Sequence, residues 1–171
     1  KEETEEAAAN VARFAHCKAS GCLATLAIGS TENQGAIANA GGIAPLVGLL
    51  TSESAVTAQY AAAALQSLAR DHTENQMNLA KAGAIGPLAN LLGSDSAATQ
   101  EHAGGALLFL ASHEASRDAV VKRLVAVLDA RSAGAQMKAA EALAVLAARS
   151  DENRRAITAA SAIVPLVKLL G

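Results

Sequence analysis

The apolar positions of this chain recur in one stretch that is written three times. The stretch 75–92 reads NQMNLAKAGAIGPLANLL, and related stretches occupy 33–50 (NQGAIANAGGIAPLVGLL) and 153–170 (NRRAITAASAIVPLVKLL). The first two copies are 42 residues apart, which is the spacing of Pro45 and Pro87. A period of about 20 to 50 residues is typical of a solenoid, in which each unit buries its apolar face against the next.

Each unit begins with a pattern that predicts two short helices. Thr73 and Gln76 have the spacing of a capping box, which predicts the start of a helix. Gly83 is expected to end that helix, because the tight turn needs a residue that tolerates positive φ. Pro87 suits the first turn of the second helix, where its missing N–H has no partner to lose. Thr31 and Gln34 repeat the capping pattern in the first unit.

A longer alanine- and leucine-rich helix is expected to close each unit. It spans about 97–112 in the second unit and about 55–70 in the first. Its apolar residues follow the helical period and predict a face that is buried in the core. In the first unit these residues are Ala61, Ala64, Leu65 and Leu68.

The third unit is shorter than the others. Leu68 and Leu88 are 20 residues apart, whereas the corresponding Leu110 and Leu124 are only 14 residues apart. Six residues are therefore missing, and the Gly–Pro turn is missing with them. We expect the first two helices of this unit to have merged into one HEAT-like helix, with Ser116 as its N-cap. Its inward residues would be Val120, Leu124, Val127 and Leu128.

The two ends of the chain fall inside repeat units. Residues 1–9 align with a second helix, although they carry Glu in place of Leu, and Leu166, Leu169 and Leu170 lack a following long helix. The chain is then either an excised piece of a longer protein or packs its C-terminal end on a neighbour, by stacking on further repeats or by self-association. The expected repeat boundaries are 1–30 (partial), 31–72, 73–114, 115–150 (shortened) and 151–171 (partial).

The segments AGGIAPLVGLL and AGAIGPLANLL, within units of three helices, resemble the armadillo repeat. The resemblance implies an all-α, right-handed superhelical solenoid of about four repeats, forming a single domain over 1–171. It also implies that the third, long helices line a concave face.

The import-receptor members of this family carry a Trp and, four residues later, an Asn on successive long helices. By alignment, the Trp positions here are Gly21, Ala63, Gly105 and Glu141, and the Asn positions are Thr25, Ser67, Phe109 and Val145. Each lost peptide hydrogen bond is worth about 0.5–1.5 kcal/mol and each lost cation–π stack about 0.5–2 kcal/mol. Recognition of import signals is therefore not expected.

What remains is a groove floored by small residues, which predicts a non-enzymatic scaffold that binds an extended or helical protein segment along the concave face. Phe109 and Met137 are candidate anchors, although Phe109 could instead turn inward and fill the shortened repeat. Gly104 and Gly105 indicate either close helix packing or close approach of a ligand. The alternative function is a purely architectural segment with an empty groove. The candidate binding residues are Thr25, Gln59, Ala63, Ser67, Glu101, Gly105, Phe109, Met137, Glu141 and Val145.

Composition narrows the partners further. The formal charge of −2 and the small basic clusters predict no phosphate-tracking surface, so nucleic acid is not an expected partner. No apolar run approaches the ~20 residues of a membrane span. Cys17 and Cys22 are five residues apart on a helix and point to different faces, so we expect two buried or half-buried thiols in a reducing compartment, cytoplasmic or nuclear.

No set of residues has the spacing of a known catalytic centre. The four histidines form no H-E-x-x-H pair, and the two cysteines form no paired C-x-x-C motif. Neither a G-x-x-x-x-G-K-[ST] loop nor a G-x-S-x-G elbow is present. The sequence therefore predicts no enzyme activity, no metal and no cofactor.

Overall fold

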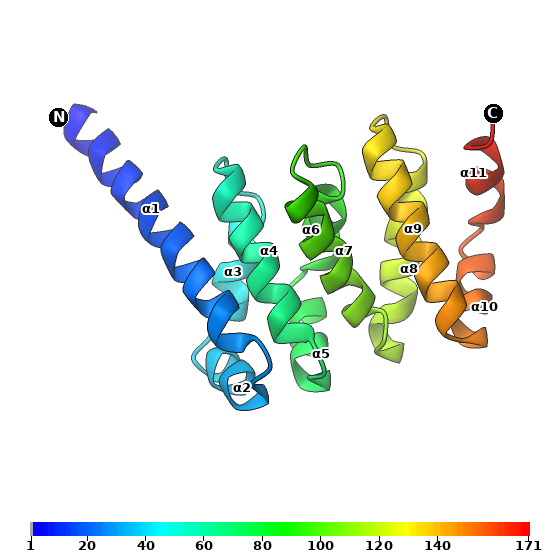
Figure 1. Ribbon diagram of the computed structural model, residues 1–171, viewed down its shortest axis with the longest axis horizontal. Helices are drawn as coiled ribbons and strands as arrows, with labels where there is room; N and C mark the ends of the chain where they lie inside the picture. The colour runs from blue at the N-terminus through cyan, green and yellow to red at the C-terminus, as the bar shows by residue number, and fades with distance from the viewer. Residues whose placement is uncertain (1) are drawn as a thin grey trace.

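The computed structural model describes residues 2–171, with side chains from residue 10 onward, and within that range every regular element is a helix (Figure 1). The all-α prediction is confirmed. The helices are α1 (Glu2–Ala27), α2 (Thr31–Asn39), α3 (Ile43–Leu49), α4 (Ala55–Ala69), α5 (Thr73–Lys81), α6 (Ile85–Leu91), α7 (Ala97–Leu110), α8 (Glu114–Leu128), α9 (Ala133–Arg149), α10 (Asp151–Ala159) and α11 (Ile163–Lys168).

The helices form a row of stacked units with two layers. The long helices α1, α4, α7 and α9 lie side by side in one layer, and the other helices lie behind them (Figure 1). α1 packs along α4, and α4 packs along α7, whereas α7 and α9 make fewer contacts with each other. Each unit therefore contacts mainly its neighbours, as in a solenoid.

The core is one continuous layer between the two rows of helices. The expected inward face of α4 is confirmed, since Ala61, Ala64, Leu65 and Leu68 are fully buried. Leu146, which corresponds in α9 to Leu68 in α4, is also fully buried. Burial of a leucine side chain contributes roughly 1.5–3 kcal/mol, so the repeated leucines supply most of the stacking energy.

The expected capping boxes are wrong by one residue. The N-cap of α2 is Ser30, whose hydroxyl accepts a bond from the Asn33 N–H at 3.2 Å. The N-cap of α5 is His72, whose Nδ1 accepts from the Asn75 N–H at 3.3 Å. The glutamine expected to complete each box instead turns to the preceding long helix, where Gln76 Nε2 donates to a backbone carbonyl at 2.9 Å.

The repeated asparagine has a structural role. In Asn33, Asn75 and Asn153, Nδ2 donates to the carbonyl oxygen seven residues earlier, at 2.9, 3.0 and 2.8 Å. Those carbonyls belong to the last turn of the preceding long helix, where no intrahelical partner exists. Asn75 also donates to the Gln34 carbonyl, one repeat back, at 3.2 Å. The asparagine thus caps one helix and, in the second unit, also ties two repeats together.

The shortened unit contains the expected single helix. α8 runs unbroken through residue 121, and its inward residues Val120, Leu124, Val127 and Leu128 are buried. Its N-cap is His113, so the assignment of Ser116 as N-cap is wrong. Ser116 instead takes the place of the repeated asparagine, because its hydroxyl donates to the carbonyl of Leu110 at the end of α7. The HEAT-like classification stays an interpretation.

The N-terminal helix differs from its prediction. Residues 2–9 continue α1 and do not form a separate second helix, so α1 extends past the end of α4 (Figure 1). No glycine or proline interrupts the chain before Gly21, and its alanines are the best helix formers. Nothing in this part of the sequence therefore ends the helix.

The turn after each first short helix needs positive φ, and the third copy meets this need with serine. Gly83 has φ 80° and Ser161, at the same place in its unit, has φ 62°. The left-handed conformation costs a non-glycine residue roughly 1–2 kcal/mol. Ser161→Gly is expected to raise the free energy of unfolding by about 0.5–1 kcal/mol, and the reverse change, Gly83→Ser, to lower it by about 1 kcal/mol. Urea unfolding of both variants checks this, and loss of stability in Ser161→Gly would contradict it.

Candidate functional site

The long-helix face is the surface formed by α1, α4, α7 and α9. Side chains at intervals of four and three residues share one side of a helix. In α4 this side carries Gln59, Ala63 and Gln66, and these residues line the groove between α4 and its neighbours. The face is therefore built from successive helices that each contribute a short row of side chains.

The first hollow of this face lies between α1, α4 and α7 and measures about 380 Å³. Five of the candidate residues line it: Thr25, Gln59, Ala63, Ser67 and Glu101. Several of its polar groups already bond within the chain. The Thr25 hydroxyl donates to the Gly21 carbonyl at 3.0 Å, and Gln59 Oε1 accepts from the Ser96 hydroxyl at 3.3 Å. Glu101 is exposed and forms none of the ion pairs found among the described side chains.

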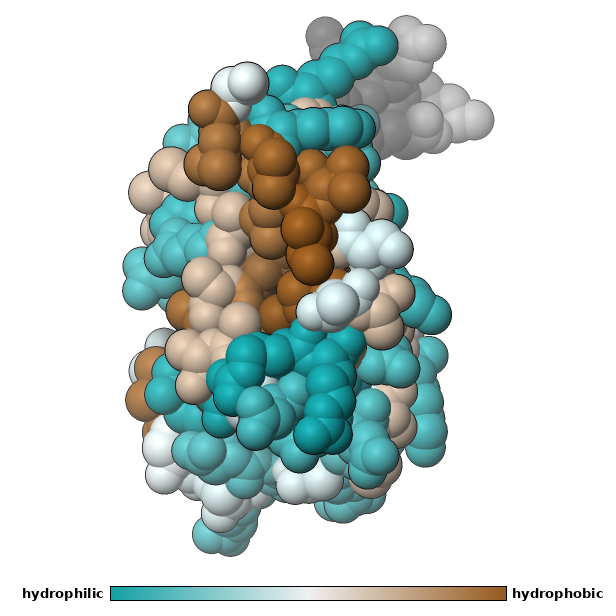
Figure 2. All heavy atoms as spheres, turned by 90° about the vertical axis from the view of Figure 1, so that its right-hand side faces the viewer, coloured by the Kyte–Doolittle hydropathy of each residue, from teal (hydrophilic) through white to brown (hydrophobic). Residues whose placement is uncertain are grey.

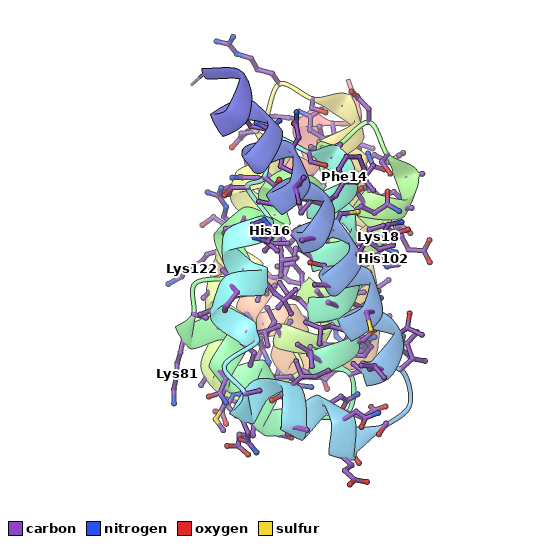
Figure 3. The ribbon with its side chains drawn as sticks, turned by 90° about the vertical axis from the view of Figure 1, so that its left-hand side faces the viewer. Phe14, His16, Lys18, Lys81, His102 and Lys122 are labelled. Carbon is purple, nitrogen blue, oxygen red and sulfur yellow. The ribbon has the colours of Figure 1, made fainter. Side chains whose placement is uncertain are left out.

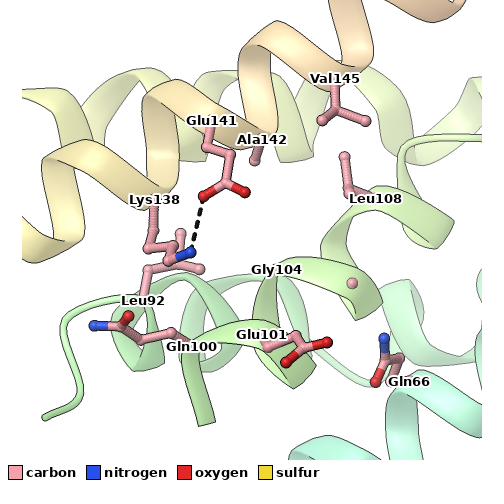
Figure 4. Close-up of a pocket in the computed structure, with 11 residues that line it drawn as sticks. Gln66, Leu92, Gln100, Glu101, Gly104, Leu108, Lys138, Glu141, Ala142 and Val145 are labelled. Atoms are coloured by element: carbon pink, nitrogen blue, oxygen red, sulfur yellow. Dashed lines mark hydrogen bonds and ion pairs between the residues drawn. The ribbon is translucent and has the colours of Figure 1, made fainter. Parts of the chain in front are cut away.

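The second hollow lies between α7 and α9 and measures about 270 Å³ (Figure 4). The candidate residues Glu101, Gly105, Glu141 and Val145 line it. Lys138 Nζ lies 2.8 Å from Glu141 Oε2, so this carboxylate is paired. Gln66 and Glu101 line both hollows, which makes them parts of one groove that crosses α1, α4, α7 and α9.

Two candidate residues lie outside both hollows. Phe109 is half-buried and packs against the core, and the Arg70 guanidinium lies 5.1 Å from its ring centroid on the other side. Met137 is exposed but lines neither hollow. A helix turns about 100° per residue. The side chain eight residues after Glu101 therefore points about 80° away from the direction of the Glu101 side chain, whereas the side chain seven residues after it points only about 20° away. Leu108, at the seventh place, lines the second hollow instead of Phe109.

Gly105 makes room for a side chain of the same protein. A Cβ built there would lie 2.1 Å from Gln66 Nε2, and Gln66 Oε1 lies 2.8 Å from His102 Nδ1. Gly104 has only an ordinary contact, with Leu92 at 3.7 Å. Close packing between α4 and α7 therefore explains Gly105, and no such demand explains Gly104.

This difference predicts opposite outcomes for two neighbouring substitutions. Gly104→Ala is expected to raise the free energy of unfolding by about 0.5–1 kcal/mol, since it removes a glycine from a helix interior. Gly105→Ala is expected to gain nothing, because Gln66 must leave its place beside His102. In a Gln66→Ala background, Gly105→Ala should recover the gain. Equal effects of both alanines in the wild-type background, measured by denaturant unfolding, would contradict this account.

The polar lining residues that the sequence prediction missed include Gln66, Arg70, Gln100, His102 and Lys138. The signal was present for the first two, since Gln66 and Arg70 follow Gln59 by seven and eleven residues and so return to the same side of the helix. The prediction used a strict spacing of four, which drifts away from that side. His102 and Lys138 precede the candidate residues Gly105 and Glu141 by three, so an interval of three would have placed them on the same side as well.

Three titratable residues outside the groove lie at the N-termini of helices. His72 and His113 are N-caps of α5 and α8. The pKa of Glu152, in the first turn of α10, is lowered by hydrogen bonds from its own backbone N–H and from Ser150. Among the side chains that the structure describes, no three His, Cys, Asp or Glu residues converge as a metal site would require.

Both cysteines are free, but their burial differs from the expectation. Cys17 is half-buried, whereas Cys22 is exposed on the open side of α1. The expectation of two sheltered thiols is therefore wrong for Cys22. Over residues 2–171, none of the helices combines the length and apolar character that crossing a membrane requires.

Comparison with known proteins agrees with the geometry. The family model of the armadillo/beta-catenin-like repeat matches residues 30–70 and 72–111. A designed armadillo repeat protein is 30% identical, with a TM-score of 0.67, and the match covers 91% of this chain and 68% of that one. The chain belongs to the armadillo repeat family, and its fold is an armadillo-type solenoid scaffold.

Two further structures are similar over most of the chain. An engineered protein is 34% identical, with a TM-score of 0.69, and the match covers 90% of this chain and 65% of that one. A designed armadillo repeat protein in complex with the peptide (KR)4 is 30% identical, with a TM-score of 0.67, over 90% of this chain and 66% of that one. This chain thus spans about two thirds of the length of these structures. None of the curated proteins matches it.

Proposed function

We propose that this protein is a non-enzymatic scaffold that binds an extended segment of another protein along its long-helix face. The observation that carries the proposal is the continuity of the two hollows, which four successive long helices line and which share Gln66 and Glu101. A groove that crosses helices in this way fits a chain lying across them. Ser67, Glu101 and His102 line the first hollow, but His102 Nδ1 is paired with Gln66 Oε1 at 2.8 Å, and among the described residues no hydrogen bond joins it to Ser67 or Glu101, which supports binding over catalysis.

The composition of the groove supports an extended ligand. Ala63 and Gly104 have small side chains at the floor of the groove, and small side chains let a backbone approach closely. Around this floor stand polar groups that can accept or donate bonds, among them Ser67 and Glu101. An apolar floor with a few scattered polar groups is typical of sites that bind a ligand by its shape and fix the orientation of that ligand with few hydrogen bonds.

The structural relatives add independent support. One relative was solved with the peptide (KR)4, and another belongs to a set designed for modular peptide recognition. In this chain the positions of the import-receptor Trp residues are glycine at Gly21 and Gly105, where Tyr60 and Gln66 lie against the backbone. We therefore propose that its ligand differs in sequence from the import signals.

A displayed library of random peptides, selected on the immobilised chain, tests the proposal. Enriched peptides are then titrated against wild type, Glu141→Lys and Asp118→Lys. Glu141 lines the second hollow, and Asp118 is exposed on α8 in the other layer. Both variants make the same charge change, so they are matched controls for each other.

Glu141→Lys is expected to weaken binding at least about tenfold, equivalent to about 1.4 kcal/mol, while Asp118→Lys leaves it within about twofold. The long lysine side chain would enter the hollow and repel cationic groups that Glu141 attracts. Peptides that bind both variants equally would place the site elsewhere.

The architectural alternative has its own support in the exposed apolar residues at the C-terminal end. In that case the groove stays empty and the repeats serve only to extend a larger solenoid. Failure to enrich any peptide over the background of the same library favours this alternative.

A further inference from the structure

The C-terminal end exposes apolar side chains, and two of them, Ile163 and Leu170, correspond to residues that are buried in earlier units. Leu170 is 87% exposed, whereas Leu50 and Leu92, at the same place in their units, are 2% and 0% exposed. Ile163 is 59% exposed, against 7% for Ile43. Figure 2 looks onto this end and shows the apolar side chains gathered in one patch. The patch, here called the tail face, consists of Ile163, Val164, Val167, Leu169 and Leu170.

The covering elements of the other units identify what the tail face lacks. α3 is covered by the long helix of its own unit, α4, and by the first helix of the next unit, α5. α6 is covered in the same way by α7 and α8. α11 has neither neighbour within residues 2–171. The missing neighbours are therefore a long helix and the short helix that follows it.

The N-terminal end carries these two elements, and they are uncovered (Figure 3). α1 is a long helix and α2 is the short helix after it. Leu26 of α1 is 49% exposed, whereas Leu68, at the same place in α4, is 0% exposed. An apolar hollow of about 430 Å³ lies here, and we call its surface the head face. Its lining residues include Leu23, Leu26, Asn33, Ala36 and Ile37.

Asn33, the polar group of the head face, lacks a partner that its equivalent Asn75 has. Asn33 is exposed, whereas Asn75 is buried and donates to the carbonyl of Gln34 in the unit before it. The residue that corresponds to Gln34 in the last unit is Arg154, in α10. A copy of α10 beside α2 would therefore offer Asn33 the carbonyl that Asn75 already has.

We propose that the tail face of one copy of this chain docks on the head face of a second copy. The junction repeats the α3–α4–α5 packing of the chain, with α11 in place of α3 and with α1 and α2 of the second copy in place of α4 and α5. Two different faces meet, so the contact is heterologous and grows into an open row instead of closing as a dimer. The long helices α9 and α1 then become neighbours, and the long-helix face continues from one copy to the next. This association is separate from the peptide groove.

Sedimentation velocity of the full chain from about 1 µM to about 1 mM, a range that covers weak association, tests the proposal. The weight-average mass is expected to rise past that of a dimer without levelling. Val167→Glu on the tail face and Leu26→Glu on the head face are each expected to weaken association at least about tenfold, because a charge would be buried without a partner. Val56→Glu is the matched control and should associate as wild type does, because Val56 is also about half exposed but lines a hollow between α1 and α4 of its own chain, away from both end faces. A chain that stays monomeric throughout overturns the proposal.

Mixing the two blocked variants separates this junction from a symmetric dimer. Val167→Glu keeps an intact head face and Leu26→Glu keeps an intact tail face, so an equimolar mixture is expected to form a dimer that grows no further. A symmetric contact between two tail faces would leave Leu26→Glu fully associating, and that result overturns the proposal. Far-UV circular dichroism of each variant confirms folding, and both substituted side chains are largely exposed.

The two cysteines of the wild-type chain allow the head-to-tail association to be measured without any substitution. Cys22 corresponds to Ala64, which is fully buried in α4, whereas Cys17 lies in a hollow beside Tyr60 on the other side of α1. The rate of Cys22 labelling by a thiol reagent is expected to fall with rising protein concentration, while that of Cys17 stays constant. If labelling of both cysteines slows in parallel, or if labelling of neither slows, the head-to-tail junction is contradicted.

Discussion

Leu68→Ala is expected to lower the free energy of unfolding by about 2–5 kcal/mol. Leu68 is fully buried between the two layers of helices, so its removal both exposes the core and leaves a cavity that the packed helices cannot close. Leu65→Ala and Leu107→Ala fall in the same class, because both leucines are fully buried. Denaturant unfolding followed by circular dichroism gives the value directly.

Leu26→Ala is the matched control, because Leu26 occupies the same place in α1 and is about half exposed. Its loss is expected to cost less than about 1 kcal/mol, since only part of the apolar area leaves an apolar environment. The comparison is made at a concentration at which sedimentation shows the chain to be monomeric, so that association through the head face does not contribute. If Leu68→Ala leaves the free energy of unfolding unchanged, the inward face of α4 is wrongly assigned.

Asn75→Ala is expected to lower the free energy of unfolding by about 2–4 kcal/mol. Its Nδ2 satisfies the carbonyls of Leu68 and Gln34, at 3.0 and 3.2 Å, and the residue is 1% exposed. A buried carbonyl left without a partner costs roughly 1–3 kcal/mol. The loss therefore combines the unsatisfied Leu68 carbonyl with the lost bond to the Gln34 carbonyl of the preceding repeat and a small cavity. Thermal and denaturant unfolding both report it.

Asn33→Ala removes the same side chain at an exposed place. Asn33 makes one bond, to the Leu26 carbonyl at 2.9 Å, and water can replace it. The expected cost is below about 1 kcal/mol. If both asparagines cost the same, burial and the bond to the preceding repeat contribute nothing, and the structural role assigned to the repeated asparagine fails.

The repeated and the varied positions of this chain serve different purposes. The residues that recur, such as Asn75 and Leu88, cap helices and fill the core. The residues that differ between units, such as Gln59, Glu101 and Glu141, line the groove. A constant framework with a varied face keeps the packing between units the same while the side chains that line the groove change from unit to unit.

The candidate site was predictable where helical geometry alone decides it. Eight of the ten candidate residues line the two hollows, because positions spaced by four along a long helix share a side over short distances. Phe109 and Met137 lie outside both hollows, and Leu108, one residue before Phe109, lines the second hollow instead. Whether the lining residues bind a partner stays a prediction.

The sequence by itself determined the helices, the solenoid and the buried leucines, since these follow from a repeated apolar pattern and from local turn chemistry at Gly83 and the prolines. It also determined that α8 replaces two helices, because six missing residues cannot be made up elsewhere. Only the tertiary structure decided that Asn75 caps the preceding helix, that Gln66 lies over Gly105, and that the two ends expose complementary faces. These features depend on contacts between units, and no pattern within one unit records the distance to its neighbour.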